Sequence, residues 1–409
     1  MNTRRILAAA LSISLVLSAG CGARPQQPAI PSSAPTQETF GVFPDSAPEL
    51  APQIDSSGSA ESSESTLDSA SESSLAEPEI VPPEQSPEPT APEFQWNTAS
   101  PEDYGLSAGT IESLHSRYPS LPVLSSMIYR NGMILDEYYA GGYDESSTFI
   151  LNSASKSITS MLIGIAIDQG LIDSVDTPIV TYFPQLQSSG DPRAQEITIR
   201  HLLTHTPGFS STDDGNWNAW RSSEDWVSYV LSQPITAQSG TTFRYFTGNT
   251  HLLSAIIQQV SGMSAYEFAM EYLFRPMGMD DVTCDSDPQG ISDGGNGFHL
   301  STRDMIKLGQ LFLDGGIYQG RQIISGQWVS ESTSLQFQRS SGTANYGYQW
   351  WVRTFGDSGY PAFFAQGHAG QYIFVVPELS LVVAITSNYE GPTGVYWEFM
   401  NDIVNSIGG

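Results

Sequence analysis

The sequence is short of positive charge, of lysine and of cysteine. Of its 409 residues, 16 are basic and 44 are acidic, which gives a formal net charge of −28. Such an acidic chain repels phosphate backbones and anionic lipid headgroups, so we expect neither nucleic-acid binding nor electrostatic attachment to a membrane surface. The two cysteines, Cys21 and Cys284, allow one disulfide at most. Only two of the basic residues are lysines, Lys156 and Lys307.

Long apolar runs are also scarce. The run over 6–16 is too short to span a membrane as a helix, but two arginines precede it and small residues follow it, as in a secretory signal peptide. Ala19-Gly20-Cys21 resembles a bacterial lipoprotein signal, in which the cysteine is lipidated. We therefore expect 1–21 to be a lipoprotein signal peptide and the mature chain to be extracytoplasmic, lipid-anchored through Cys21 to the bacterial cell membrane. The alternative is an ordinary signal peptide that happens to contain a cysteine.

The next segment lacks the apolar residues that a core needs. Residues 22–95 hold 13 of the 26 prolines, 14 serines and 13 carboxylates against a single arginine. This composition predicts a disordered acidic Pro/Ser-rich linker, which would hold a folded domain away from the membrane. From Trp96 onward the sequence is aromatic-rich and globular in composition, so we expect the folded domain over 96–409.

Periodicity within 96–409 predicts strands near both ends and helices in the middle. An Asn131-Gly132 turn between apolar runs predicts a hairpin over 125–139, and further strands are expected at 346–354, 372–376 and 381–385. Helical spacing is found at 106–114, 153–169, 198–204, 223–232, 249–260, 264–274, 302–313 and 395–407. The pattern predicts an α+β fold, with an antiparallel sheet flanked by helices, a mainly helical lobe, and a cleft between them.

A serine and a lysine stand three residues apart at the start of the apolar helix predicted over 153–169. In Ser153-Ala-Ser-Lys156 this spacing puts both side chains on one helix face. A serine hydroxyl needs a nearby base to become a nucleophile, and a lysine can act as that base when burial destabilises its ammonium. A helix N-terminus also favours a developing negative charge. The motif is weak evidence alone, because serine is abundant in this chain.

Five segments in order resemble the serine β-lactamase and penicillin-binding-protein superfamily, in its class C-like hydrolase and esterase branch. They are Ser153-Ala-Ser-Lys156 with the helix that follows, Ile197-Thr-Ile-Arg-His-Leu-Leu-Thr-His-Thr-Pro-Gly208, Gly240-Thr-Thr-Phe-Arg-Tyr245, Ser301-Thr-Arg-Asp-Met-Ile-Lys-Leu-Gly309, and Gly367-His-Ala-Gly370 with the strand after it. Within the branch, the segments around Tyr245 and Gly370 are most similar to 6-aminohexanoate-dimer hydrolases and related esterases. The resemblance implies the β-lactamase/transpeptidase-like α+β fold.

The resemblance also implies roles for individual residues. Ser153 would be the acylated nucleophile, Lys156 the base or proton shuttle, and Tyr245 a further proton carrier, partly deprotonated beside the ammonium. The oxyanion hole would combine the N–H of Ser153 with one from the segment His368–Gln371. His368, Gly370, Gln371 and Thr247 would thus line the substrate and oxyanion region. No cofactor and no metal are implied.

Two departures from the family pattern bear on the substrate. His368 stands where penicillin-recognising enzymes usually have a lysine that meets a substrate carboxylate, which argues against high β-lactam affinity. Thr247 stands where asparagine is common, and a hydroxyl offers fewer hydrogen bonds than an amide. The expected activity is hydrolysis of a small-molecule or peptide ester or amide. The alternatives are a penicillin-binding, peptidoglycan-directed D-Ala-D-Ala peptidase or recognition protein with little turnover, and a non-enzymatic solute-binding lipoprotein.

Other motifs in the folded region favour structural roles. His201 and His205 have the spacing of a zinc pair, but the glutamate of that motif is missing. The acidic segment 285–296 imitates a calcium loop, yet a proline interrupts it and Asn296 replaces the bidentate glutamate. We interpret this segment as an ordinary polar loop.

Overall fold

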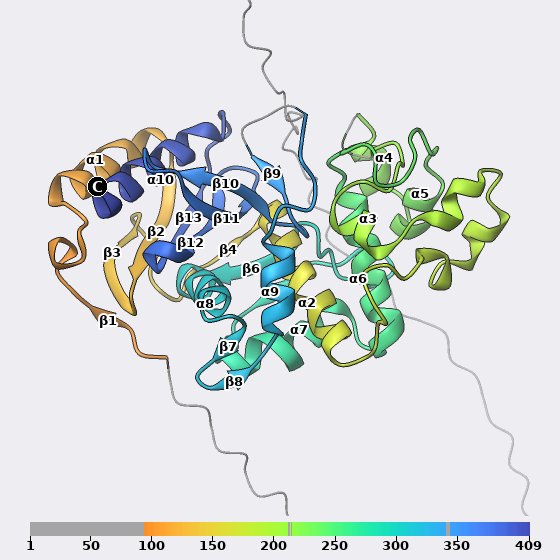
Figure 1. The fold of residues 1–409 in the computed structure, drawn as a ribbon, viewed down its shortest axis with the longest axis horizontal. Helices are drawn as coiled ribbons and strands as arrows, with labels where there is room; N and C mark the ends of the chain where they lie inside the picture. The colour runs from red at the N-terminus through yellow and green to blue at the C-terminus, as the bar shows by residue number, and fades with distance from the viewer. Residues whose placement is uncertain (1–93, 212, 214, 341–343) are drawn as a thin grey trace, which may run out of the picture. The chain divides into compact units, whose positions relative to one another are not determined.

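The computed structural model describes residues 94–409 except 212, 214 and 341–343 (Figure 1). The lipoprotein signal expected at 1–21, with Cys21, and all but the last two residues of the linker expected at 22–95 lie outside the described residues. None of the helices that the structure describes combines the length and the apolar character that a membrane span requires.

One eight-stranded sheet joins the two ends of the folded region, as the sequence predicts. Its order is β1-β3-β2-β13-β12-β11-β10-β9, and every neighbouring pair is antiparallel except β1 with β3. The early hairpin therefore pairs through β2 with the last strand of the chain. The strands are β1 (Asn97–Thr98), β2 (Val123–Arg130), β3 (Met133–Tyr139), β9 (Asn345–Tyr346), β10 (Trp351–Phe355), β11 (Tyr360–Gly367), β12 (Gln371–Val376) and β13 (Leu381–Ser387).

Helices cover both faces of this sheet. On one face, the helices α1 (Ala108–Arg117) and α10 (Gly394–Gly408) contribute to an apolar cluster with strand residues such as Phe374. On the other face lies α8 (Thr302–Leu313). The approach of α8 requires Gly309, since a Cβ there would lie 2.4 Å from a methyl carbon of Val382 on β13.

The remaining helices build the lobe beside the sheet (Figure 1). Almost all of α2 is buried, from Ser155 to Ala166, as its apolar pattern predicts. Short elements complete the fold: the strands β4 (Thr148–Ile150), β5 (Thr283–Cys284) and β6 (Phe298–Ser301) in a second sheet, and the hairpin β7 (Ile317–Tyr318) and β8 (Arg321–Gln322). The helices are α2 (Ser155–Asp168), α3 (Ile199–Leu203), α4 (Trp217–Arg221), α5 (Trp226–Leu231), α6 (Thr247–Ser261), α7 (Ala265–Ala269) and α9 (Gly326–Ser332).

The strands differ from the expectation at two places. The single strand predicted at 346–354 is broken between β9 and β10, because Gly347 packs against the carbonyl of Ser332, 2.2 Å from where its Cβ would lie, and Gln349 adopts a left-handed φ of 62°. The strand β11 was not predicted, although it lies in the middle of the sheet. Its last residue, Gly367, lies against Leu151 and Ala154, which flank the predicted nucleophile in the chain.

Candidate active site

Ser153 lies in a tight turn wedged against the end of β11. The turn is a 3₁₀ segment, Asn152–Ala154, that leads directly into α2. The Asn152 side-chain amide donates to the His368 carbonyl at 3.1 Å, which joins the turn to the sheet. A Cβ on Gly367 would lie 2.1 Å from the Leu151 carbonyl oxygen, so only glycine allows this approach. The first residue of the expected third motif therefore packs against the turn that carries Ser153, at Leu151 and Ala154.

Lys156 reaches Ser153, as the three-residue spacing predicts. Its Nζ donates to Ser153 Oγ at 2.9 Å and to the Gly295 carbonyl at 2.9 Å. The side chain is buried, and burial lowers the pKa of Lys156 to about 8, while the carboxylates of Asp213 and Asp293 act in the opposite direction. At pH 7, roughly one molecule in ten then carries a neutral Lys156 amine that can accept a proton.

Tyr245 completes a cluster of three polar side chains. Its ring centroid lies 5.0 Å from Lys156 Nζ, and the ring stacks on Trp351 at 5.9 Å. Burial raises the pKa of the Tyr245 phenol, and a hydrogen bond with Ser153 opposes this only in part. This direction runs against the partly deprotonated tyrosine that the resemblance implies, because desolvation disfavours the phenolate. At neutral pH the shift favours the neutral phenol, which can donate a proton.

Asn296 is a member of this cluster that the sequence analysis missed. Ser153 Oγ donates to Asn296 Oδ1 at 3.3 Å, and the Asn296 amide nitrogen is buried with no hydrogen-bond partner in the described part of the chain. The residue belongs to Gly294-Gly295-Asn296-Gly297, where Cβ atoms on Gly294 and Gly295 would meet side chains of α2 and α6 at 2.3 and 2.6 Å. The three glycines around Asn296 could have indicated this position, since residues without a Cβ allow a loop to pack closely against buried helices.

Three of the other predicted site residues do not point at Ser153. The N–H and hydroxyl groups of Thr247 donate to the Asp213 carboxylate, with the hydroxyl at 2.9 Å. Gly370 has a left-handed φ of 92°, and its Cβ position is occupied by Ser387 and Tyr396. Gln371 is buried, and its side-chain amide donates to the Ser387 carbonyl at 2.6 Å. Gly370 and Gln371 thus shape the turn behind β11.

His368 lies at the edge of the site. Its backbone carbonyl binds Asn152, while its imidazole Nε2 lies 2.9 Å from a carboxylate oxygen of Glu390. Both side chains are substantially exposed, at 41% and 70%. A positive charge on His368 is therefore already matched by an acidic neighbour that the sequence motif did not include.

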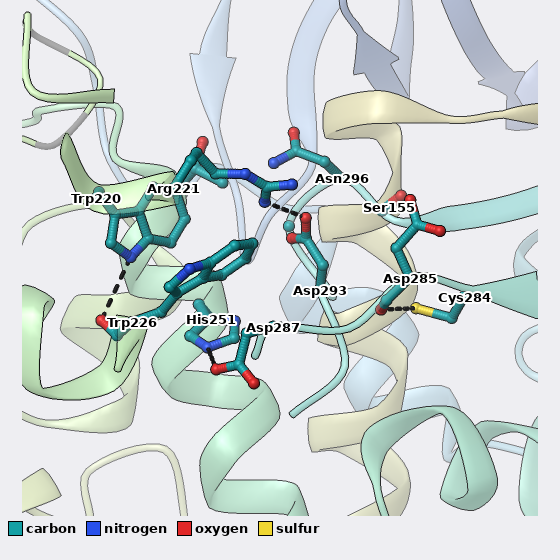
Figure 2. Close-up of polar contacts among 12 residues, drawn as sticks. Ser155, Trp220, Arg221, Trp226, His251, Cys284, Asp285, Asp287, Asp293 and Asn296 are labelled. Carbon is teal, nitrogen blue, oxygen red and sulfur yellow. Dashed lines mark hydrogen bonds and ion pairs between the residues drawn. The ribbon is translucent and has the colours of Figure 1, made fainter. Parts of the chain in front are cut away.

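The residues of the two competing metal motifs have separate partners. His201 Nδ1 accepts from the backbone N–H of Thr198 at the start of α3, whereas His205 is buried beside the Tyr245 ring at 4.6 Å. Burial lowers the pKa of His205 well below its usual value, so its imidazole is neutral. In the segment 285–296, Asp287 pairs with His251 and Asp293 with Arg221 (Figure 2). Within the described residues, no group of three or more such side chains is placed to hold a metal ion.

The chain is similar to known proteins in sequence and in fold. A family model described as Beta-lactamase matches residues 112–397. The chain is 25% identical to 6-aminohexanoate-dimer hydrolase of Paenarthrobacter ureafaciens over 335 residues, which cover 76% of this chain and 84% of that protein. Two solved structures share the fold. A class C beta lactamase from Rhodobacter sphaeroides has a TM-score of 0.57 at 19% identity, covering 75% of this chain and 100% of that one. EstCE1, a hydrolase with promiscuous acyltransferase activity, has a TM-score of 0.62 at 17% identity, and the match covers 76% of this chain and 100% of that one.

Proposed function

Since the chain belongs to the Beta-lactamase family, we propose that it is a serine hydrolase that cleaves an ester or a linear amide through an acyl-enzyme. The observation that carries this proposal is the contact of Ser153 Oγ with Lys156 Nζ at 2.9 Å, deep in a site where the lysine is desolvated. A hydroxyl next to an amine of lowered pKa is the arrangement that an activated serine requires.

In the proposed reaction, the neutral Lys156 amine takes the proton from Ser153 as Oγ attacks the carbonyl carbon of the substrate. The neutral Tyr245 phenol protonates the leaving alcohol or amine and recovers a proton from the Lys156 ammonium. Water then attacks the acyl-enzyme, and the same proton transfers in reverse release Ser153. The N–H of Ser153 and the Gly367–His368 end of β11 are the candidates for stabilising the oxyanion.

The experiment is labelling by a serine-reactive phosphonate, followed by turnover of p-nitrophenyl esters. We expect the wild-type protein to be labelled and the Ser153→Ala variant to be neither labelled nor active. Ser160→Ala is the matched control, because Ser160 is also buried on α2 but its hydroxyl has no hydrogen-bond partner within the described residues. Labelling of Ser153→Ala at the wild-type rate would disprove the assignment.

The surroundings of His368 favour substrates without a carboxylate near the reacting carbonyl. Glu390 pairs with the imidazole, so it competes with a substrate carboxylate for His368 and would repel it. We expect short-chain esters and linear amides to be cleaved faster than a chromogenic cephalosporin or a D-Ala-D-Ala peptide. Stable acylation by a fluorescent penicillin with negligible ester hydrolysis would instead favour the penicillin-binding alternative.

The location of the protein is also a proposal. The lipoprotein-like signal ending at Cys21 supports an extracytoplasmic protein, lipid-anchored to the bacterial cell membrane, with 22–95 as the spacer. In a bacterial host, the wild-type chain should fractionate with membranes and incorporate labelled fatty acid. The Cys21→Ser variant should lose the label, and a wild-type chain that never acquires it would exclude the anchor.

A further inference from the structure

Arg221 links a tryptophan-rich part of the helical lobe to the loop that carries Asp293 and Asn296 (Figure 2). It is the last residue of α4, and its guanidinium carbon lies 3.9 Å from the centroid of the Trp226 ring. Arg221 Nη1 donates to Asp293 Oδ2 at 2.5 Å. The arginine side chain is 32% exposed, whereas that of Asp293 is 1% exposed. A buried carboxylate in this position depends on the charge of its partner.

Asp293 in turn anchors the turn that meets Ser153 and Lys156. Its backbone carbonyl accepts from the N–H groups of Asn296 at 3.1 Å and Gly297 at 2.7 Å. This turn presents the Gly295 carbonyl to Lys156 Nζ and Asn296 Oδ1 to Ser153 Oγ. A shift of Asp293 would therefore move two hydrogen-bond acceptors of the catalytic centre together.

We propose that Arg221 is a positioning residue of this centre: by holding Asp293, it keeps the turn at 293–297 in place against Ser153 and Lys156. The inference rests on the proposed hydrolase function. Arg221 itself contacts neither the nucleophile nor the base in the described structure, so it acts through Asp293.

The same pair also sets the electrostatic balance at Lys156. The charged and titratable groups around the amine are the carboxylates of Asp213 and Asp293, the Tyr245 phenol and the neutral imidazole of His205. Both carboxylates raise the pKa of Lys156 against the effect of burial. We expect the Arg221 guanidinium, paired with Asp293, to offset part of that carboxylate's effect. In a variant that lacks Arg221 but keeps Asp293 ionised, Asp293 would hold the lysine proton more strongly and leave less neutral amine to act as a base.

The scarcity of lysine makes this inference measurable without any catalytic assay. Labelling the protein with [¹³Cε]lysine yields two NMR signals, from Lys156 and Lys307, and the Lys307→Arg variant assigns them. We expect Arg221→Gln to move the titration of the Lys156 signal to higher pH and Asp293→Asn to move it to lower pH. The double variant, Arg221→Gln with Asp293→Asn, should return it close to the wild-type position.

The rate of phosphonate labelling as a function of pH provides the second measurement. In Arg221→Gln, the pH at which the labelling rate increases should move upward by the same amount as the titration of the lysine signal. Below that pH, each pH unit by which it moves should lower the labelling rate about tenfold. Arg117→Gln is the matched control, because Arg117 also lies over an aromatic ring, Phe399 at 4.2 Å, and pairs with Asp402 at 2.6 Å. The control should leave both measurements at wild-type values.

Two results would overturn the positioning role: an unchanged Lys156 titration in both Arg221→Gln and Asp293→Asn, or an equal shift in Arg117→Gln. The failure of the proposed function would look different. A folded wild-type protein that the phosphonate does not label would exclude the hydrolase, whereas the lysine titration would still test whether Arg221 controls the environment of Lys156.

Discussion

Each of the two lysines of the chain lies on a largely buried helix, three residues after a polar residue that it contacts, yet their surroundings differ. Lys156 lies three residues after Ser153 at the start of α2, and Lys307 lies three residues after Asp304 in α8. Lys156 Nζ meets a hydroxyl and a carbonyl, whereas Lys307 Nζ meets the Asp304 carboxylate at 3.1 Å and the Gly278 carbonyl at 2.8 Å. The side-chain oxygen that Lys156 contacts is neutral and the one that Lys307 contacts is a carboxylate, and this difference supports the proposal that Lys156 is a base and Lys307 an ion-pair partner.

Replacing each lysine by arginine keeps the positive charge but prevents deprotonation, and it should affect the labelling rate very differently at the two positions. We expect Lys156→Arg to lower the rate of phosphonate labelling by about 10³-fold, because a guanidinium cannot give up its proton to become a base. Lys307→Arg, measured in the same assay, should stay within about twofold of wild type, since its partner only needs a cation. Equal losses in the two variants would break the comparison.

Replacing each lysine by methionine removes the positive charge, and this should destabilise the fold more at Lys307 than at Lys156. Lys307→Met leaves the buried Asp304 carboxylate without its ion-pair partner, so we expect the free energy of unfolding to fall by about 3 kcal/mol. Lys156→Met removes a desolvated ammonium whose hydrogen-bond partners within the described residues are a hydroxyl and a carbonyl, so it should cost less or even stabilise the fold. Urea denaturation of both variants measures the difference, and a larger loss for Lys156→Met would contradict it.

Tyr245 distinguishes the surroundings of Lys156 further. If the phenol passes protons between Lys156 and the leaving group, Tyr245→Phe should reduce ester turnover by about 10²-fold. Because burial raises the pKa of Tyr245, the substitution should not move the lower limb of the pH–rate profile. A lower limb that shifted in Tyr245→Phe would assign the titrating base to tyrosine rather than to Lys156.

The pH dependence gives the smallest of these effects. The pKa of Lys156 is lowered to about 8, so neutral amine accumulates as the pH rises through 8. We expect kcat/KM for an uncharged ester to increase about tenfold per pH unit below pH 8 and to level off above it. Stability has the same sign: between about pH 8 and the ordinary lysine pKa the unfolded chain binds more protons than the folded one, so the free energy of unfolding rises with pH relative to Lys156→Met.

Much of the fold follows from local pattern. Asn131-Gly132 predicts the hairpin because both residues tolerate the left-handed backbone that the turn adopts, with φ values of 50° and 80°. The 302–313 pattern predicts α8 with the bounds that the structure shows, since Ser301 caps its first turn by accepting from the Asp304 N–H. β11 escaped prediction because its residues mix aromatic and small side chains without clear alternation, and only its neighbours in the sheet define it as a strand.

The sequence by itself determined that Ser153 and Lys156 meet, since three residues on a helix bring two side chains to one face regardless of the rest of the fold. The tertiary structure decided which segments distant in the sequence lie next to Ser153 and Lys156. It brought Gly367, rather than Gly370, against the nucleophile turn, and it placed Asn296 from an apparently ordinary loop beside Ser153. It also gave Lys156 its lowered pKa, because desolvation and the charges around an amine depend on which segments surround it. The spacing of residues along the sequence does not predict those surroundings.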